Sequence, residues 1–253
     1  MSNPGLRAAF THAAFQAAEM PDREFYRERA DRVEGPVLEM GCGTGRIYLA
    51  LLRAGLDADG FDISAAALAV LREHAAEEEL EPTVWQGDMT QFTVDRAYAM
   101  VYCPFNAFQR LLTHEAQLAT LDAAHEALAP GGSLVFDVFV PAFEFICDSY
   151  GEWQTETVTF RGELHERRTR ATIVDEPQQS FAVETEAIGP DGERLFTDNH
   201  RATMLPRGEV ELLARLSPFE EWHATGDFTD EPLADGHTTQ VWTLEKALEG
   251  QHR

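Results

Sequence analysis

Residues 35–40 form a short apolar run, GPVLEM, that ends in the turn GCGTG and passes at once into a helix-like segment at residues 46–56. Three glycines spaced one apart, Gly41, Gly43 and Gly45, leave bare Cα atoms and open backbone N–H groups where the expected strand stops. A strand that turns into a helix through such glycines is typical of a ligand-binding edge in a parallel sheet. The turn therefore predicts both a kind of fold and the place of a ligand.

Strand-like and helix-like segments alternate through the first half of the chain. Runs of apolar and β-branched residues are followed by segments with helical apolar spacing, and Ser64 is placed to cap one of these helices. The expected strands are residues 35–40, 57–62, 82–88, 97–104 and 133–140, and the expected helices are residues 46–56, 64–79 and 113–132. Such alternation predicts βαβ units and a mostly parallel sheet with helices on both faces.

The pattern changes after about Pro141. Residues 152–205 alternate β-forming with polar residues in four stretches separated by turn sequences, which predicts an antiparallel meander. A helix is expected at residues 206–216, followed by strands at 219–228 and 237–246. We therefore expect an α/β protein with a doubly wound, mostly parallel seven-stranded sheet of Rossmann-like type and an antiparallel β-meander insertion.

Four parts are expected along the chain. They are an N-terminal helical cap at residues 1–34, a ligand-binding core at 35–150, the β insertion at 151–205 and a C-terminal part at 206–253 that completes the core. Because the insertion follows the last strand of the core's parallel half, it can fold back over the strand ends as a lid or pocket wall.

Three cysteines, Cys42, Cys103 and Cys147, are widely spaced and form no CxxC pair. Their spacing argues against a disulfide framework and against a zinc site, so no metal is expected. No apolar window approaches the roughly 18 residues needed to cross a bilayer, and the first twenty residues lack the apolar block of a signal peptide. We therefore expect a cytoplasmic protein that does not bind membranes.

The composition is strongly acidic, because 44 Asp and Glu residues against 20 Lys and Arg give a net charge of −24. Lys246 is the single lysine. This charge argues against binding to nucleic acid or anionic membrane, since affinity for phosphate depends on lysine and arginine. Two interpretations of the composition stay open: a GC-rich genome, which favours arginine over lysine, and a halophilic source, where high salt screens the self-repulsion.

The glycine turn does not fit the common phosphate-binding motifs. Arg46 stands where the dinucleotide fingerprint has its third glycine, and no Gly-Lys-Ser/Thr follows as in a P-loop. Asp62 ends the second expected strand, where a carboxylate can accept hydrogen bonds from both ribose hydroxyls of a nucleoside. Asp88 and Met89 follow the third strand, where they can border an adenine ring. The pattern predicts a nucleoside ligand without a pyrophosphate.

Five segments in this order resemble the class I S-adenosylmethionine-dependent methyltransferases of the small-molecule type: VLEMGCGTGR, FDIS, QGDM, AYAMVYCPFN and LAPGGSLVFDVF. The resemblance covers roughly residues 20–140 and implies the Rossmann-like methyltransferase fold, with S-adenosyl-L-methionine as cofactor and S-adenosyl-L-homocysteine as product. The residues that it implies for cofactor binding are Gly41, Cys42, Gly43, Gly45, Asp62, Ile63, Asp88, Met89, Cys103 and Tyr26.

Each implied contact has its own role. The glycines would line the methionine and ribose portion, Asp62 would bind the ribose and Ile63 would pack on adenine. Cys103 would present backbone near the amino-acid part. Tyr26 lies in REFYRERA, which resembles the helix that closes over the cofactor in this branch. Structural alternatives remain: packing for Tyr26, a turn for the aspartate of GDM and core filling for its methionine.

The segment CPFNAF after the fourth strand is where this family faces the transferred methyl group. It lacks the Asn/Asp-Pro-Pro-Tyr/Phe pattern of enzymes that methylate exocyclic amino groups of bases or glutamine amides. Together with the charge, this argues against a nucleic-acid substrate. Phe105, Asn106 and Phe108 are candidates for the acceptor pocket, with a turn role as the alternative for Asn106. His200 in the insertion is a candidate base or substrate contact.

The insertion also carries a local excess of basic residues, namely His165, Arg167, Arg168, Arg170, His200 and Arg201. They are interpreted either as surface ion pairs with the abundant glutamates or as a site for an acidic acceptor. Alternation along the strand places His165 and Arg167 on one face and Arg168 and Arg170 on the other.

A sulfonium already carries an activated methyl group, so positioning supplies most of the catalysis and no catalytic residue is assigned. We expect a methyltransferase that acts on a nitrogen or oxygen of a small-molecule acceptor by direct in-line transfer. The alternatives are a methyltransferase for a protein partner and a cofactor-binding module without transfer. The sequence predicts neither the acceptor nor the oligomeric state, monomer or homodimer.

Overall fold

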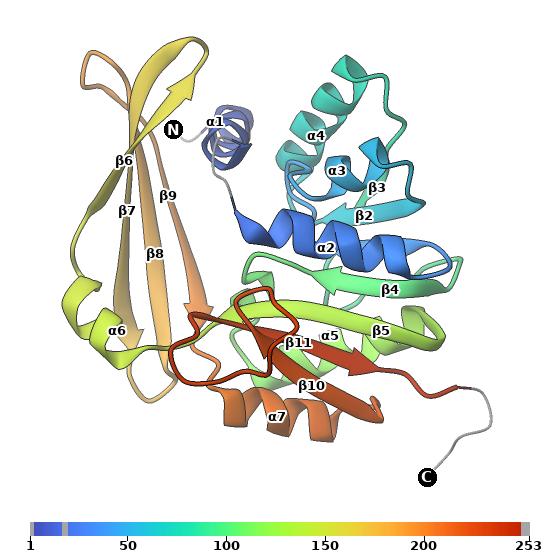
Figure 1. Ribbon diagram of the computed structural model, residues 1–253. Coiled ribbons are helices and arrows are strands. Elements are labelled where there is room, and N and C mark those ends of the chain that lie inside the picture. Colours follow the sequence, from blue (N-terminus) through green and yellow to red (C-terminus); the bar gives the residue numbers. More distant parts are fainter. Residues whose placement is uncertain (1–2, 17–19, 249–253) are drawn as a thin grey trace.

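In the computed structural model, which describes residues 3–16 and 20–248, the chain forms two β-sheets that lie beside each other (Figure 1). The first sheet has the strand order β10-β11-β5-β4-β1-β2-β3. Its strands are β1 (Val37–Met40), β2 (Ala58–Asp62), β3 (Thr83–Gln86), β4 (Tyr98–Cys103), β5 (Leu128–Phe139), β10 (Glu221–Gly226) and β11 (Thr239–Glu245). Strands β1 to β5 pair in parallel, and β11 runs antiparallel to β5 and β10. The predicted mostly parallel, seven-stranded sheet is confirmed.

The second sheet is antiparallel, with the strand order β6-β7-β8-β9. Its strands are β6 (Gln154–Phe160), β7 (Glu163–Asp175), β8 (Ser180–Ile188) and β9 (Arg194–Thr203). The turn between β6 and β7 consists of Arg161 and Gly162, which both have positive φ, as a two-residue hairpin turn requires. The antiparallel meander predicted for residues 152–205 is therefore confirmed.

Helices cover both faces of the seven-stranded sheet. On one face lie α2 (Pro21–Arg32), α3 (Tyr48–Arg53) and α4 (Ala65–Glu77), and on the other lie α5 (His114–Ala127) and α7 (Arg207–Leu216). Successive strand residues alternate between the two cores: Met100 and Tyr102 of β4 face the α2 side, and Val101 and Cys103 face the α5 side. Both faces are buried, which explains the nearly continuous apolar runs of these strands.

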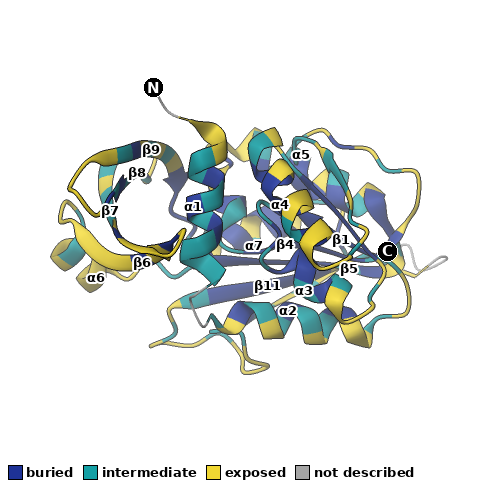
Figure 2. Ribbon diagram, turned by 90° about the horizontal axis from the view of Figure 1, so that it is seen from above, coloured by how far each residue is buried: buried dark blue, intermediate teal, exposed yellow. Residues whose placement is uncertain are grey.

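Helix α1 (Pro4–Gln16) lies between the four-stranded sheet and α4, as Figures 1 and 2 both show. Phe10 packs edge-to-face on Phe160 and Phe196, with ring centroids 5.3 and 5.5 Å away. On the opposite side, the His12 ring stacks on His74 of α4 at 3.8 Å. Through α1, the insertion is tied to the core.

The observed elements differ most from the predicted ones in three places. The helix predicted to end at a Pro-Gly-Gly stop ends earlier, at Ala127, and β5 already begins at Leu128. The reason is a register irregularity between Tyr98 and Met100, which lets β5 pair on both sides of the glycines. Two short helices were not predicted: the 3₁₀ helix η1 (Ala107–Arg110) and α6 (Phe143–Ser149). The cap at Ser64 is confirmed, since its hydroxyl accepts from the α4 backbone at 3.2 Å.

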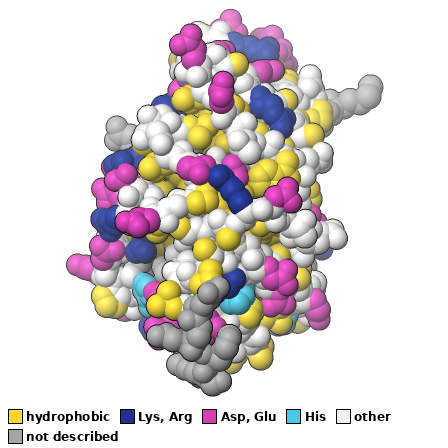
Figure 3. All heavy atoms as spheres, turned by 90° about the vertical axis from the view of Figure 1, so that its right-hand side faces the viewer, with side chains coloured by type: hydrophobic (Ala, Val, Ile, Leu, Met, Phe, Trp, Pro, Cys, Tyr) yellow, Lys and Arg dark blue, Asp and Glu magenta, His cyan; other side chains and the backbone are white. Residues whose placement is uncertain are grey.

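Acidic side chains are spread over the surface, and Figure 3 shows them across one face with basic side chains between them. Among residues 3–16 and 20–248, no helix has the length and apolar character to cross a bilayer. All three cysteines are free thiols, of which Cys147 alone is exposed.

Candidate active site

The turn after β1 contains three glycines with φ of +76°, +55° and +88°, a conformation that favours glycine. They are needed for different reasons. A Cβ on Gly45 would lie 2.9 Å from the side chains of Leu49 and Leu71, so packing alone accounts for that glycine. A Cβ on Gly43 would meet nothing nearer than Asp62 Oδ2 at 3.9 Å. The bare Cα of Gly43 therefore borders open space beside a carboxylate.

Asp62 ends β2 with its carboxylate fixed by the backbone. Its Oδ2 accepts from the Gly43 N–H at 2.9 Å and its Oδ1 from the Ser64 N–H at 2.7 Å. Each carboxylate oxygen can accept a further hydrogen bond, and the side chain is only half-buried. Ile63, the next residue, is 69% exposed. An oriented carboxylate, a bare glycine Cα and an open apolar side chain fit the sugar and base of a nucleoside.

Asp88 and Met89 follow β3, on the same edge of the sheet. Asp88 Oδ1 accepts from the N–H and the hydroxyl of Thr90, at 2.9 and 2.8 Å, so this aspartate does form a turn. Its Oδ2 has no hydrogen bond to another described residue. The Met89 methyl lies 3.9 Å from the position of a Cβ on Gly41, and the rest of the side chain packs against the core. Both residues combine the structural role with a position beside the glycine turn.

Two carboxylates lie inside the protein at the ends of β1 and β5. Glu39 accepts a hydrogen bond from the Tyr102 hydroxyl at 2.8 Å, and burial raises the pKa of its carboxyl to about 8. Asp137 is 1% exposed and accepts from the Tyr26 hydroxyl at 2.7 Å; burial raises its pKa to about 6. The rings of Tyr26 and Tyr102 stack at 5.3 Å. Tyr26, a predicted cofactor contact, is thus fully buried and links α2 to β5.

Asp137 also shapes the turn after β4. Its two oxygens accept from the backbone N–H groups of Phe105 and Asn106, at 2.9 and 2.8 Å. Cys103, the last residue of β4, is fully buried, so it can offer only its backbone to a ligand at the turn. Phe108 packs on Phe136 of the core at 4.6 Å, which places its ring in the interior rather than at the edge of the sheet. Sequence reasoning gave Asp137 no role, although an aspartate within an apolar strand was a signal.

Arg46, which breaks the dinucleotide fingerprint, has a defined structural role. Its guanidinium forms a two-pronged ion pair with Asp22 of α2, in which Nη1 donates to Oδ1 at 2.8 Å. The same guanidinium lies over the Phe105 ring, 5.2 Å from the centroid, and Phe105 contacts Phe15 of α1 edge-to-face at 4.9 Å. Helices α1 and α2 therefore both reach the strand ends where the glycine turn lies.

His200 lies on β9, near Arg110 of η1 and near the ion pair of Arg7 with Asp198. Burial, followed by the charge of Arg110, lowers the pKa of His200 to about 4, so the imidazole is neutral at pH 7. Four other basic residues of the insertion have partners of their own. Arg167, Arg168 and Arg170 pair with glutamates, as the ion-pair interpretation predicts, and His165 packs against Phe10 and Phe160.

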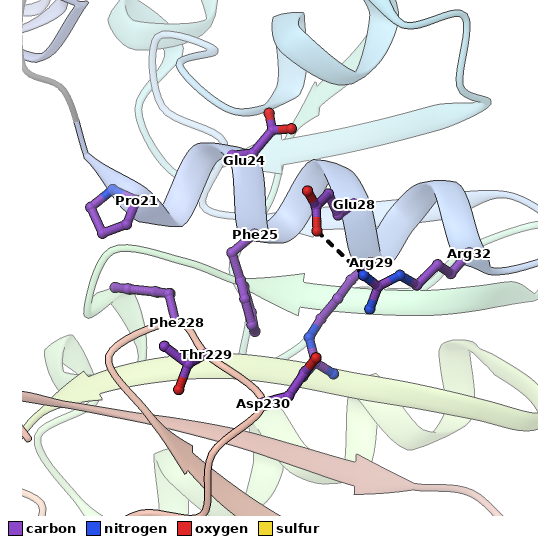
Figure 4. A pocket seen from close by; sticks show the side chains of 9 residues that line it. All are labelled: Pro21, Glu24, Phe25, Glu28, Arg29, Arg32, Phe228, Thr229 and Asp230. Carbon is purple, nitrogen blue, oxygen red and sulfur yellow. Dashed lines mark hydrogen bonds and ion pairs between the residues drawn. The ribbon is translucent and has the colours of Figure 1, made fainter.

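A pocket of about 210 Å³ lies elsewhere, between α2 and the loop that joins β10 to β11 (Figure 4). It is lined by Pro21, Glu24, Phe25, Glu28, Arg29, Arg32, Phe228, Thr229 and Asp230. Arg29 lies over the Phe25 ring and pairs with Asp230 at 3.3 Å, so the two walls of the pocket are bound to each other. None of the residues predicted for the cofactor lines this pocket. Among the described residues, no group of three or more His, Cys, Asp and Glu is arranged to hold a metal ion.

Comparisons with known proteins agree with this geometry. Residues 37–132 match the sequence profile of a family described as methyltransferase domain. The cypemycin N-terminal methyltransferase of a Streptomyces species is 26% identical over 83% of this chain and 82% of its own length. The dTDP-3-amino-3,6-dideoxy-alpha-D-glucopyranose N,N-dimethyltransferase of Streptomyces fradiae is 28% identical over 75% of both chains.

Solved structures with the same fold include the CcbJ methyltransferase from Streptomyces caelestis, with a TM-score of 0.73, 23% identity and 92% coverage of both chains. CalS10, an amino pentose methyltransferase from Micromonospora echinaspora, has a TM-score of 0.70 and 21% identity over 92% of this chain and 95% of its own. Fold, motif order and these similarities define a class I S-adenosylmethionine-dependent methyltransferase. Its relatives and structural neighbours include methyltransferases that act on small molecules, in agreement with the resemblance of its five segments.

Proposed function

We propose that this enzyme transfers a methyl group from S-adenosyl-L-methionine to an amine nitrogen of a small metabolite of the amino-sugar class. Two relatives are named as N,N-dimethyltransferases of dTDP-amino sugars and match about three quarters of this chain. The observation that carries the proposal is the four-stranded sheet after β5, on a core whose strand ends carry the glycine turn. Structures named as amino pentose and sugar N-methyltransferases each match 92% of this chain, a share too large to leave out the whole of this sheet.

The cofactor is proposed to lie against the turn after β1. Gly41 and Gly43 allow its close approach, Asp62 accepts from the ribose, and Ile63, Asp88 and Met89 border the adenine. When bound, the cofactor supplies a methyl group that is already activated by the positive sulfur. The protein then has to hold the acceptor nitrogen in line with that group and exclude water. Such positioning lowers the activation barrier by up to roughly 7–11 kcal/mol.

The acceptor is proposed to lie between the turn after β4 and the inner face of β9. Phe105 and Asn106 border it on the core side and His200 on the insertion side. Because His200 stays neutral, it can exchange a hydrogen bond with the acceptor but holds a proton poorly. We therefore assign His200 to acceptor contact and leave the proton of the amine to solvent.

The test is transfer from methyl-labelled S-adenosylmethionine, with dTDP-3-amino-3,6-dideoxyglucose as one acceptor and a size-fractionated bacterial extract as another. Label in the amino sugar or in the small-molecule fraction of the extract is expected. Label in the protein fraction instead would favour a protein acceptor, in line with the name of the cypemycin relative. Tight binding of S-adenosylhomocysteine without any transfer would leave a cofactor-binding module and overturn the proposal.

The acidic surface concerns where the enzyme works rather than what it does. We infer a cytoplasmic enzyme from a salt-accumulating organism, because a net charge of −24 destabilises the compact state unless salt screens it. The melting temperature should then rise as potassium chloride is raised from 0.1 to 2 M. A melting temperature that does not respond to salt would favour the explanation from genome composition.

A further inference from the structure

The turn after β4 contains two consecutive residues other than glycine in the left-handed region, Phe105 at φ +61° and Asn106 at φ +56°. Asparagine tolerates this region, but in a bulky residue such as phenylalanine it is strained. Such a conformation persists only where the surrounding structure holds it. Strain of this kind, at the edge of a sheet that carries a binding site, calls for an explanation.

Three groups hold the turn from both sides. Asp137 accepts from both backbone N–H groups of the turn, and the Tyr26 hydroxyl donates to the same carboxylate. Beyond the turn, the buried Gln109 donates to the carbonyl of Thr203 at 2.9 Å and accepts from the N–H of Phe139 at 3.2 Å. The turn is therefore fixed to α2, β5 and β9, which are the elements around the proposed acceptor site.

The turn presents a polar atom that the rest of the protein does not satisfy. The side-chain oxygen of Asn106 is buried, with no hydrogen-bond partner among residues 3–16 and 20–248. An unpaired buried acceptor of this kind destabilises the protein, so it is expected where a ligand supplies the donor. The neighbouring Ala107 Cβ lies 3.6 Å from the position of a Cβ on Gly41, so this turn and the glycine turn touch.

We propose that Asp137 and Asn106 together position the methyl acceptor. Asp137 is a positioning residue that holds the strained turn, and Asn106 accepts a hydrogen bond from an N–H of the acceptor amine. The inference rests on the proposed function, since it requires an amine. With one N–H held by Asn106, the lone pair of the nitrogen is free to form the new C–N bond as the C–S bond breaks. The electron pair of the C–S bond stays on sulfur. The ammonium product then loses a proton to solvent.

This contact predicts where methylation stops. A primary amine and its monomethyl product both have an N–H for Asn106, whereas a tertiary amine has none. The enzyme should therefore add up to two methyl groups to a primary amine and form no quaternary ammonium, which mass spectrometry of the small-molecule products would detect. Formation of a trimethylated product at a rate similar to the first two steps would contradict the contact.

The direct test compares Asn106→Gly with Asn106→Asp, because glycine keeps the turn without the amide and aspartate keeps an acceptor oxygen. Label transfer into the small-molecule fraction of an extract should fall at least tenfold in Asn106→Gly and recover in Asn106→Asp. Calorimetry with S-adenosylhomocysteine should give the same affinity, within twofold, for all three proteins. A parallel loss of this affinity would assign the amide to the cofactor, and unchanged transfer in Asn106→Gly would show that the amide has no role; either result overturns the proposal.

Wild-type protein that transfers no label to any fraction would instead refute the proposed function, and the acceptor contact with it.

The role of Asp137 has a test that needs no acceptor. Asn106→Gly should melt at or above the temperature of wild type, and above Asn106→Ala, because glycine has no penalty at positive φ. Asp137→Asn should lower the melting temperature less in the Asn106→Gly background than alone, or fold only in that background. Equal melting temperatures of Asn106→Gly and Asn106→Ala would mean that the turn is not strained at this position and would overturn the role of Asp137.

Discussion

The seven-stranded core buries several carboxylates, whereas no carboxylate of residues 154–203 is buried. In the core, Glu39 and Asp137 are buried, and each accepts hydrogen bonds from defined partners. In the insertion, Arg167, Arg168 and Arg170 pair with glutamates at partly exposed positions. A buried carboxylate fixes the positions of its hydrogen-bond partners, because leaving it unpaired would strongly destabilise the fold. An exposed ion pair, in contrast, contributes only about 0–1 kcal/mol to the free energy of unfolding. The core is therefore specified in detail at the edge where the glycine turn lies, and the charged surface of the insertion is less constrained.

The two regions also differ in how their sheets are covered. Helices bury both faces of the core sheet, while the inner face of the insertion depends on α1 at one end and on the α6 region at the other. At the α1 end, one ring, Phe10, contacts Phe160, Phe196 and His165. The insertion should consequently open more readily than the core, with α1 as its main attachment.

The largest effect that tests this difference is expected for Phe10→Ala. Removal of a buried phenylalanine costs about 3–5 kcal/mol. Because the lost contacts are with β6, β7 and β9, amide hydrogen exchange should rise across β6–β9 while β1, β4 and β5 keep their protection. Leu134→Ala in the centre of β5 is the matched control and should raise exchange in both sheets. Equal increases in both sheets for Phe10→Ala would mean that the two regions unfold as one unit.

A second prediction concerns the buried carboxylates of the core. The pKa of Glu39 is raised by burial to about 8, so its stabilising neutral form is fully present below the unfolded value near 4.5 and is lost as pH rises through 8. Between pH 5 and 9, wild type should lose up to a few kcal/mol of unfolding free energy that Glu39→Gln keeps. The exposed Glu73 of α4 provides the control, since Glu73→Gln should follow the wild-type curve in denaturant titrations. If the unfolding free energies of Glu39→Gln and wild type changed with pH in parallel, the raised pKa of Glu39 would be contradicted.

The smallest effect is expected in the insertion. Arg168→Gln removes one ion pair with Glu166, at side chains that are 42% and 50% exposed. The unfolding free energy should change by less than about 1 kcal/mol, and added salt should reduce the difference further. A loss of several kcal/mol in urea titrations would show that the charges of the insertion are as specific as those of the core.

The sequence was most informative where local chemistry decides the structure. The glycine turn, Ser64 as helix cap and the alternation of residues 152–205 each follow from backbone conformation or from strand periodicity, and each is observed. The order of the five segments was sufficient to predict the fold. Asp62 is observed at the end of β2, as the strand pattern predicts, and its contact with the ribose stays a prediction.

Long-range contacts could not be predicted in the same way. Arg46 reads as a break in a fingerprint until Asp22, 24 residues earlier, is seen beside it. The role of Asp137 depends on backbone groups of the turn after β4, 31 and 32 residues away. The early start of β5 depends on a register irregularity that no local pattern shows. In each case, the deciding partner is distant along the chain.

The central claim is that the turn after β1 and Asp62 together bind a sulfonium nucleoside by its sugar. The most direct measurement is a calorimetric cycle with S-adenosylhomocysteine and its 2′-deoxy analogue, on wild type and on Asp62→Ala. Because a charged hydrogen bond contributes about 1.5–3 kcal/mol, loss of the hydroxyl should weaken binding to wild type by at least about tenfold and binding to the variant hardly at all. The same loss in both proteins, or wild-type affinity in the variant, would contradict the claim.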